Sequence, residues 1–164
     1  MKPLDISQLF DRFGEAMYRY LTVKLGSPDD AEDVLQEVFC RLVKYSFRLR
    51  LVHDLRAFAF RIARNEASRF LQRKIHGEQA AQPAAGFAES LRRSYSGPDG
   101  LSEQAIAAAL TRIPDEQREV IILRIFEGLS FREIAAVSGQ SINTVASRFR
   151  YGIEKMRTLM EGGK

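Results

Sequence analysis

The sequence of 164 residues contains one cysteine, two histidines and no tryptophan, and it has no apolar run of membrane-spanning length. A single cysteine excludes an internal disulfide, and Cys40 with His53 and His76 has no spacing typical of a metal site. Charged residues recur every few positions near the start, which is atypical of a signal peptide or anchor. We therefore expect a soluble, cytoplasmic protein with no metal, no cofactor and no membrane insertion.

The net charge is also small, at +4, so any nucleic-acid surface must come from local clustering of basic residues. The charges are in fact segregated along the chain. Residues 29–44 hold five acids against two bases, whereas residues 48–76 hold eight bases against two acids. An acidic segment is therefore followed directly by a basic one.

Apolar residues at helical spacing predict three helices in the first half, over residues 4–25, 28–44 and 55–75. Gly26 suits the end of the first helix, and Ser27 before Pro28 suits the start of the second. The apolar stripe of the second helix runs from Ala31 to Val43. On the third helix, the spacing places Phe60 on the outer, basic side. Glu66 falls on the inner side, where a buried acid would need a partner.

Residues 45–54 interrupt the helical spacing and combine aromatic with basic side chains, and they end at Asp54, a suitable N-cap for the third helix. Cations that follow phosphates, with rings that stack on bases, are typical of proteins that hold single-stranded nucleic acid. The candidate side chains in this loop and on the third helix are Tyr45, Phe47, Arg48, Arg50, His53, Arg56, Arg61, Arg64 and Asn65.

Residues 77–100 are rich in alanine, glutamine, glycine, serine and proline and lack periodicity, so we expect a flexible linker. After it, Ser102 is expected to cap a helix that ends near residue 112. Pro114 is expected to begin another, whose dense apolar run from Val120 to Phe126 suits the centre of a small bundle.

Residues 128–157 have the pattern of two helices joined by a tight turn. Ser130 and Glu133 form a capping box, and Gly139 suits the left-handed turn that ends a helix. The second helix has one apolar stripe, beginning at Ile142, and its other side offers polar and basic groups that suit the major groove of DNA. These residues are Ser141, Asn143, Thr144, Ser147, Arg148 and Tyr151. A helix-turn-helix is predicted, although a merely solvated basic face would give a similar pattern.

The fold predicted from these elements is all-α, with two small helical modules and a linker between them. The N-terminal module covers residues 1–76 and the C-terminal module, which contains the helix-turn-helix, covers residues 101–164.

Three segments of the chain, in this order, closely resemble bacterial RNA polymerase sigma factors of the extracytoplasmic-function type. DAEDVLQEVFCRLVK (residues 30–44) resembles the helix that binds the β′ clamp helices of polymerase, and LRAFAFRIARNEASRFLQRK (residues 55–74) resembles the helix that engages the −10 promoter element. Residues 113–157 resemble the module that binds the −35 element. The resemblance implies a non-enzymatic subunit that directs core polymerase to promoters and helps to melt the −10 region.

The resemblance also implies roles for individual residues. Polymerase docking would involve Asp33, Gln36, Glu37 and Arg41. The loop of residues 45–54 would capture an extruded base, and the basic residues after it would hold the melted strand. The six polar residues after Gly139 would lie at the −35 groove. The implied partners are core polymerase, through its β′ clamp helices and β flap, promoter DNA and, in many members, an anti-sigma factor.

Some positions differ from the family pattern. The chain has no tryptophan near residues 43–44 or 58, where the family usually has one. Arg69 stands where an acid is common and Glu66 where an apolar residue is common. Ala146 replaces a frequent lysine, which removes one phosphate contact.

Three other classes of protein agree less well with the sequence. A helix-turn-helix regulator that is not a polymerase subunit would keep the C-terminal module but has no need of the acidic and basic helix pair. An enzyme such as a recombinase needs a nucleophile with supporting residues, and Ser68 with the two histidines forms no such set, so no catalytic residue is expected. A structural adaptor would show no salt-dependent affinity for DNA.

Overall fold

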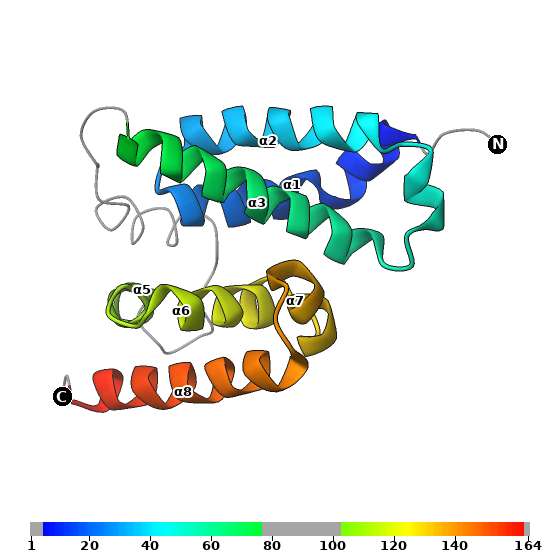
Figure 1. Cartoon of the computed structure of the whole chain (residues 1–164). Helices are drawn as coiled ribbons and strands as arrows, with labels where there is room; N and C mark the ends of the chain where they lie inside the picture. The colour runs from blue at the N-terminus through cyan, green and yellow to red at the C-terminus, as the bar shows by residue number, and fades with distance from the viewer. Residues whose placement is uncertain (1–4, 77–102, 163–164) are drawn as a thin grey trace.

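The computed structural model describes residues 5–76 and 103–162. The described part is helical and contains no strand, as the sequence predicts. The N-terminal module consists of α1 (Ile6–Leu25), α2 (Pro28–Lys44), the short 3-10 helix η1 (Arg48–Leu51) and α3 (Leu55–His76). The C-terminal module consists of α5 (Glu103–Thr111), α6 (Asp115–Ile121), the π-helical turn η2 (Ile122–Phe126), α7 (Phe131–Ser138) and α8 (Ile142–Glu161) (Figure 1). The linker predicted for residues 77–100 and the cap predicted at Ser102 lie outside the described residues.

Local signals set the ends of the N-terminal helices. Gly26 adopts φ 72° after α1, and the Ser27 side chain accepts a hydrogen bond from the backbone N–H of Asp30 at 3.3 Å to cap α2. Asp54 accepts from the N–H of Ala57 at 3.0 Å at the start of α3. These predicted caps are confirmed.

The N-terminal module is a three-helix core in which α1, α2 and α3 all pack against one another. Its largest fully buried side chains include Met17, Leu21 and Leu42. The stripe predicted on α2 is buried or half-buried from Ala31 to Leu42, but Val43 is exposed. Successive side chains of an α-helix differ in direction by about 100°, so Val43 points away from the core that Leu42 faces.

The outer side of α3 is also covered, which contradicts the sequence prediction for Phe60. This ring is 1% exposed and packs edge-on against Tyr20, with 5.7 Å between ring centroids. Arg56, Phe60 and Arg64 are four residues apart and therefore share one face of the helix. Both arginines bond to residues of the C-terminal module, so this face of α3 lies against that module.

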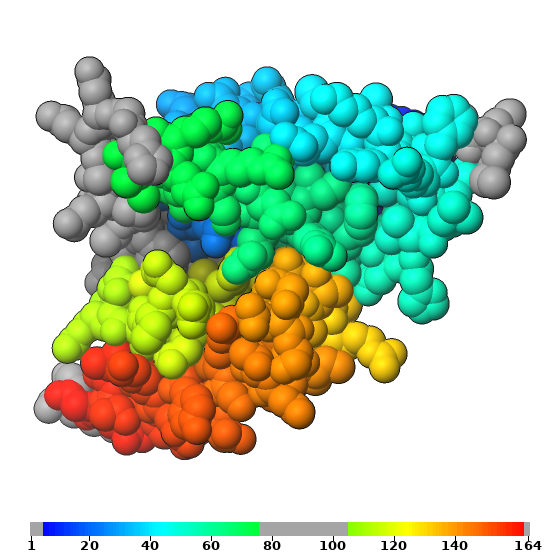
Figure 2. Space-filling model, in the orientation of Figure 1, coloured from blue at the N-terminus to red at the C-terminus, as the bar shows by residue number. Residues whose placement is uncertain are grey.

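The two modules thus share one continuous cluster of buried apolar side chains. The main helix contact between them is that of α3 with α7. Figure 2 shows the same arrangement from one side, where the green surface of α3 meets the yellow and orange surface of the C-terminal module without a gap.

The predicted central helix of the C-terminal module ends in a widened turn. Val120 to Leu123 are buried as predicted, but Ile125 is exposed. The chain here forms the π-helical turn η2, in which the N–H of Glu127 bonds to the carbonyl of Ile122, five residues back, at 3.1 Å. A turn of this width shifts the helix register, so the apolar run no longer faces one side.

The helix-turn-helix forms as predicted. Ser130 and Glu133 make both bonds of the capping box, Gly139 has φ 71°, and the Ser141 side chain caps α8. The apolar stripe of α8 begins at Val145, since Ile142 is exposed at the first position of the helix.

Gly152 lies in the middle of α8 and is buried against α6. A Cβ atom at this position would lie 2.8 Å from Cδ1 of Ile121 and 3.2 Å from Cβ of Gln117. The glycine therefore permits the close approach of the two helices that positions the polar side of α8.

The substitution Gly152→Val should lower the free energy of unfolding by about 1–3 kcal/mol, because the added methyl groups force α8 away from α6. Urea unfolding followed by circular dichroism measures the change. Glu154→Val is the matched control, because it introduces the same β-branched side chain at an exposed position of α8. An equal loss of stability in both variants would contradict the close-approach explanation.

Candidate nucleic-acid interface

The acidic face of α2 is formed by three of the four residues predicted to dock on polymerase. Asp33, Gln36 and Glu37 are all exposed, and their spacing places them on one face of the helix. The opposite face holds Val34 and Val38 in the core, which fixes the direction in which the acidic face points. The face is therefore a rigid, negatively charged surface.

Arg41, the fourth residue predicted to dock on polymerase, is only partly exposed, because its side chain contacts α3. Its guanidinium forms an ion pair with Glu66 of α3, and its Nε lies 4.0 Å from Glu37. The Glu66 side chain is 4% exposed and also accepts a hydrogen bond from Arg69 at 3.0 Å. The buried acid therefore has the partners that its burial requires, and it ties α2 to α3.

The loop before α3 is anchored by one apolar residue and exposes the others. Leu49 is buried, whereas Phe47 is 63% and Leu51 79% exposed. Tyr45 lies edge-on to Phe58, with 6.0 Å between ring centroids. The loop thus presents large apolar groups together with the following exposed cations: Arg48 and Arg50. Leu51 was not among the candidates, because the sequence does not show that Leu49 is buried and Leu51 exposed.

A hollow of about 480 Å³ lies where the loop joins α3. Its wall includes His53 from the loop, Arg12 from α1 and Arg56 from α3, together with Glu133 from the C-terminal module. The volume falls in the range of small-molecule pockets, so a nucleobase would fit in it.

The basic residues of α3 divide into two groups. Arg61 and Asn65 are exposed, as expected for residues that would hold a DNA strand. Arg56 and Arg64 are half-buried and turn toward carboxylates of the C-terminal module. The structure therefore places only part of the predicted strand-binding face in solvent.

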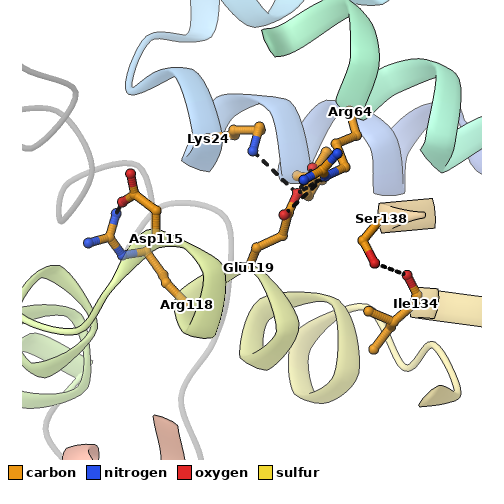
Figure 3. Close-up of polar contacts among 8 residues, drawn as sticks. Lys24, Arg64, Asp115, Arg118, Glu119, Ile134 and Ser138 are labelled. Atoms are coloured by element: carbon orange, nitrogen blue, oxygen red, sulfur yellow. Dashed lines mark hydrogen bonds and ion pairs between the residues drawn. The ribbon is translucent and has the colours of Figure 1, made fainter. Parts of the chain in front are cut away.

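Glu119 of α6 lies at the centre of this contact (Figure 3). Its carboxylate accepts hydrogen bonds from the Tyr20 hydroxyl at 2.7 Å, from Lys24 at 3.3 Å and from Nε of Arg64 at 3.0 and 3.1 Å. Burial acts to raise the pKa of Glu119, but the charges of Lys24 and Arg64 outweigh it and lower the pKa. The pKa of Arg64 is raised by Glu119, against the opposing effect of burial. Both groups are therefore held in their charged forms.

Glu133 forms a second contact with α3. It accepts from Nε and Nη2 of Arg56 at 2.8 and 2.7 Å, and it also accepts from the N–H of Ser130 at 3.0 Å in the capping box. The hydrogen bond from Arg56 lowers the pKa of Glu133 from 4.5 to about 2. A lowered carboxylate pKa contributes stability that is complete above about pH 4.5 and is lost as the pH falls toward 2.

Neither carboxylate was predicted from the sequence as a partner of α3. Glu133 was recognised only as part of a capping box, and Glu119 is one of three acids in α6, with no spacing that marks it as a partner of α3. The available signal was Phe60: a large apolar residue between Arg56 and Arg64 on one helix face indicates that something covers that face.

The residues predicted to read the −35 element lie on the first turns of α8. Asn143 and Tyr151 are exposed, and Thr144 and Ser147 are half-buried. The Ser141 hydroxyl donates to the Thr144 hydroxyl at 2.9 Å, which fixes both at the start of the helix. Arg148 lies 3.5 Å from the Glu116 carboxylate. Val145 and Gly152 face the other way, into the module, so the predicted set shares one outer side of α8.

No group of three histidine, cysteine or acidic side chains within residues 5–76 and 103–162 is arranged to hold a metal ion. None of the helices in those ranges is both long and apolar enough to cross a membrane.

The comparisons with known proteins match both modules. Residues 9–75 match the family model "Sigma-70 region 2", and residues 103–156 match "Sigma-70, region 4". RNA polymerase sigma factor SigZ of Bacillus subtilis is 25% identical over 162 residues, covering 97% of this chain and 89% of SigZ. The ECF RNA polymerase sigma factor EcfG of Rhodopseudomonas palustris is 29% identical over 136 residues, covering 82% of this chain and 74% of EcfG.

A solved structure shares the fold. It is the sigma factor RpoE of Bartonella quintana in complex with the anti-sigma factor NepR, with a TM-score of 0.66 and 23% identity, covering 94% of this chain and 96% of the other. The two sigma-70 regions occur in the same order as the two modules, and together they cover most of the chain. The chain therefore belongs to the extracytoplasmic-function sigma factors, which direct RNA polymerase to promoters.

Proposed function

We propose that the exposed acidic face of α2 docks on the β′ clamp helices of core polymerase through Asp33, Gln36 and Glu37. The observation that supports this assignment best is the separation of charge between two adjacent helices: α2 presents acids to solvent and α3 presents bases. Arg41 stabilises the position of this surface, since its ion pair with Glu66 joins α2 to α3.

In the proposed mechanism, the loop of residues 45–54 and the basic face of α3 bind the unpaired strand of the −10 element. Extruding a base costs a few kcal/mol, and binding the extruded base and its phosphates must offset this cost. The exposed rings of Tyr45 and Phe47 supply surfaces for stacking, and the hollow beside His53 is large enough for one base. The cations assigned to the strand are Arg48, Arg50, Arg56, Arg61 and Arg64, with Asn65 as a hydrogen-bonding group.

The outer side of α8 is proposed to bind the −35 element in the major groove, with Asn143, Thr144 and Ser147 near base edges and Arg148 near phosphate. Ser141 and Tyr151 complete the set. This division of roles gives the N-terminal module, residues 1–76, the polymerase and −10 contacts, and gives the C-terminal module, residues 101–164, the −35 contacts, with the linker 77–100 between them.

Three further properties belong to the same proposal. The protein acts in the cytoplasm, where bacterial polymerase is located. It has no catalytic residue of its own and needs no cofactor, because polymerase carries out the bond-forming chemistry. A protein of the anti-sigma class is a proposed regulator, since the similar RpoE structure contains such a partner.

The double variant Asp33→Arg/Glu37→Arg should abolish binding to core polymerase and transcription from a cognate promoter, because two attractive charges become repulsive. Both side chains are exposed, so the fold should be kept. Co-elution with core polymerase on gel filtration and promoter-specific transcription measure the effect.

The matched control is Asp11→Arg/Glu15→Arg, which reverses two exposed acids of α1. It should co-elute and transcribe like the unmodified protein. Normal transcription by the α2 variant would contradict the docking assignment. Failure of the unmodified protein itself to co-elute would favour a DNA-binding regulator that is not a polymerase subunit.

Arg148→Ala should weaken binding to duplex −35 DNA about tenfold at low salt and reduce the slope of log K against log salt by about 0.9, since one phosphate contact is lost. Fluorescence anisotropy over a salt series measures both quantities. Arg157→Ala, at the far end of α8, is the control and should leave the slope unchanged. A salt slope that Arg148→Ala leaves unaltered would contradict a phosphate contact.

A further inference from the structure

A second hollow, of about 230 Å³, lies between α2 and α3. Asp33 and Glu37 line it from α2, and Arg69 and Arg73 line it from α3. All four of these side chains are exposed. The hollow is therefore a cleft with one acidic wall and one basic wall, and its acidic wall is part of the surface assigned to polymerase.

The two walls of the cleft are held in place by contacts between the helices. The buried carboxylate of Glu66 pairs with Arg41 of α2 and with Arg69 of α3, so it joins the two helices. Val34 and Phe70 complete the lining beside it. The separation of the walls is thus set before any partner binds, and a preorganised surface loses little freedom on binding.

The charges of the two walls do not neutralise one another by direct pairing. Within residues 5–76 and 103–162, no ion pair joins Asp33 or Glu37 of the acidic wall to either arginine of the basic wall. Arg73 has no hydrogen-bonded or ionic partner in the same ranges. Opposite charges that stay exposed on two sides of a cleft are available to a partner that brings the complement of each.

The basic wall lies on a different side of α3 from the residues assigned to DNA. Successive residues of a helix turn by about 100°, so Arg73, twelve positions after Arg61, points about 120° away from it. Arg69 bonds to Glu66, which is on the side of α3 that packs against α2. A strand held along Arg61 and Asn65 therefore follows another side of the helix, whereas a partner seated on the acids of α2 lies beside Arg73.

We infer that the surface that docks on polymerase continues from α2 across the cleft onto Arg69 and Arg73, and that the clamp helices of β′ present acids opposite these two arginines. This inference rests on the proposed docking of α2 on the clamp helices. A surface with both signs of charge fixes the orientation of its partner, because a shifted or reversed partner brings like charges together. Arg69 is a position at which the chain differs from the family pattern, so the basic wall distinguishes this docking surface from the common one.

The variant Arg73→Glu tests the basic wall in the full-length protein. The side chain is exposed, so the fold should be kept, which circular dichroism checks. Its dissociation constant for immobilised core polymerase, measured by biolayer interferometry without DNA, should rise about tenfold, because an attraction becomes a repulsion. A second variant, Arg69→Gln/Arg73→Gln, removes both charges without reversing them and should also raise the dissociation constant, by a smaller factor.

The matched control is Arg132→Glu, which makes the same change of charge at an exposed position of α7. It should bind core polymerase as the unmodified protein does. If Arg73→Glu bound as tightly as this control, the inference would be overturned. Normal polymerase binding by Arg73→Glu combined with a loss of affinity for single-stranded DNA would overturn it as well, and would make Arg73 a DNA contact.

An exchange of charge in the partner separates a direct contact from an effect on the fold. Each acid of the β′ clamp helices is replaced in turn by lysine, and each altered core polymerase is assayed with the unmodified protein and with Arg73→Glu. One of these lysine substitutions should weaken binding of the unmodified protein and restore binding of the variant. If no substitution restores binding, the arginine does not meet an acid of the clamp helices and the inference fails.

Failure of the proposed function is read separately, from Asp33→Arg/Glu37→Arg in the same binding assay. Normal binding by this variant would refute the docking of α2 and with it the premise of the inference. Loss of binding by this variant, together with unchanged binding by Arg73→Glu, would refute the inference alone.

Discussion

The buried pairing of Arg64 with Glu119 is the interaction on which the arrangement of the whole molecule depends. α3 carries a high density of positive charge, yet two of its faces are covered, one by α1 and α2 and another by the C-terminal module, while Arg61 and Asn65 stay exposed. A guanidinium is brought into such a contact only if a carboxylate meets it, because an unpaired buried charge is costly. Glu119 meets this requirement with support from Lys24 and Tyr20, and Phe60 fills the apolar space on the same face of α3.

Electrostatics organises the molecule at two levels. Asp33 and Glu37 of α2 are exposed to solvent, where a large partner can reach them, whereas Glu119 and Glu133 of the C-terminal module point at the bases of α3. The acids of α2 that face solvent are therefore available to a partner. Glu119 and Glu133 are instead paired with arginines of the same chain.

Much of the fold could be predicted from the sequence, because helix ends depend on local chemistry. Ser27, Asp54, the Ser130–Glu133 box and Gly139 all act as expected. Contacts between distant segments were not predictable in this way. The cover over Phe60, the partner of Arg64 and the close approach at Gly152 all depend on residues more than thirty positions away. The residues predicted for docking and for DNA binding come from resemblance and from pattern, whereas Glu119 and Glu133 were not predicted as partners of α3. Glu119 is one of three acids in α6, and Glu133 was accounted for by the capping box.

The most direct test of the central claim, that the pairing of Arg64 with Glu119 holds the two modules together, is the distance between the modules when Glu119 is replaced. One dye is placed on Cys40, which is exposed on α2, and the other on a cysteine introduced by Glu154→Cys on α8. Resonance energy transfer is then compared between this protein and the same protein carrying Glu119→Ala. The account predicts that transfer changes in the variant, as the modules separate. Unchanged transfer would contradict it.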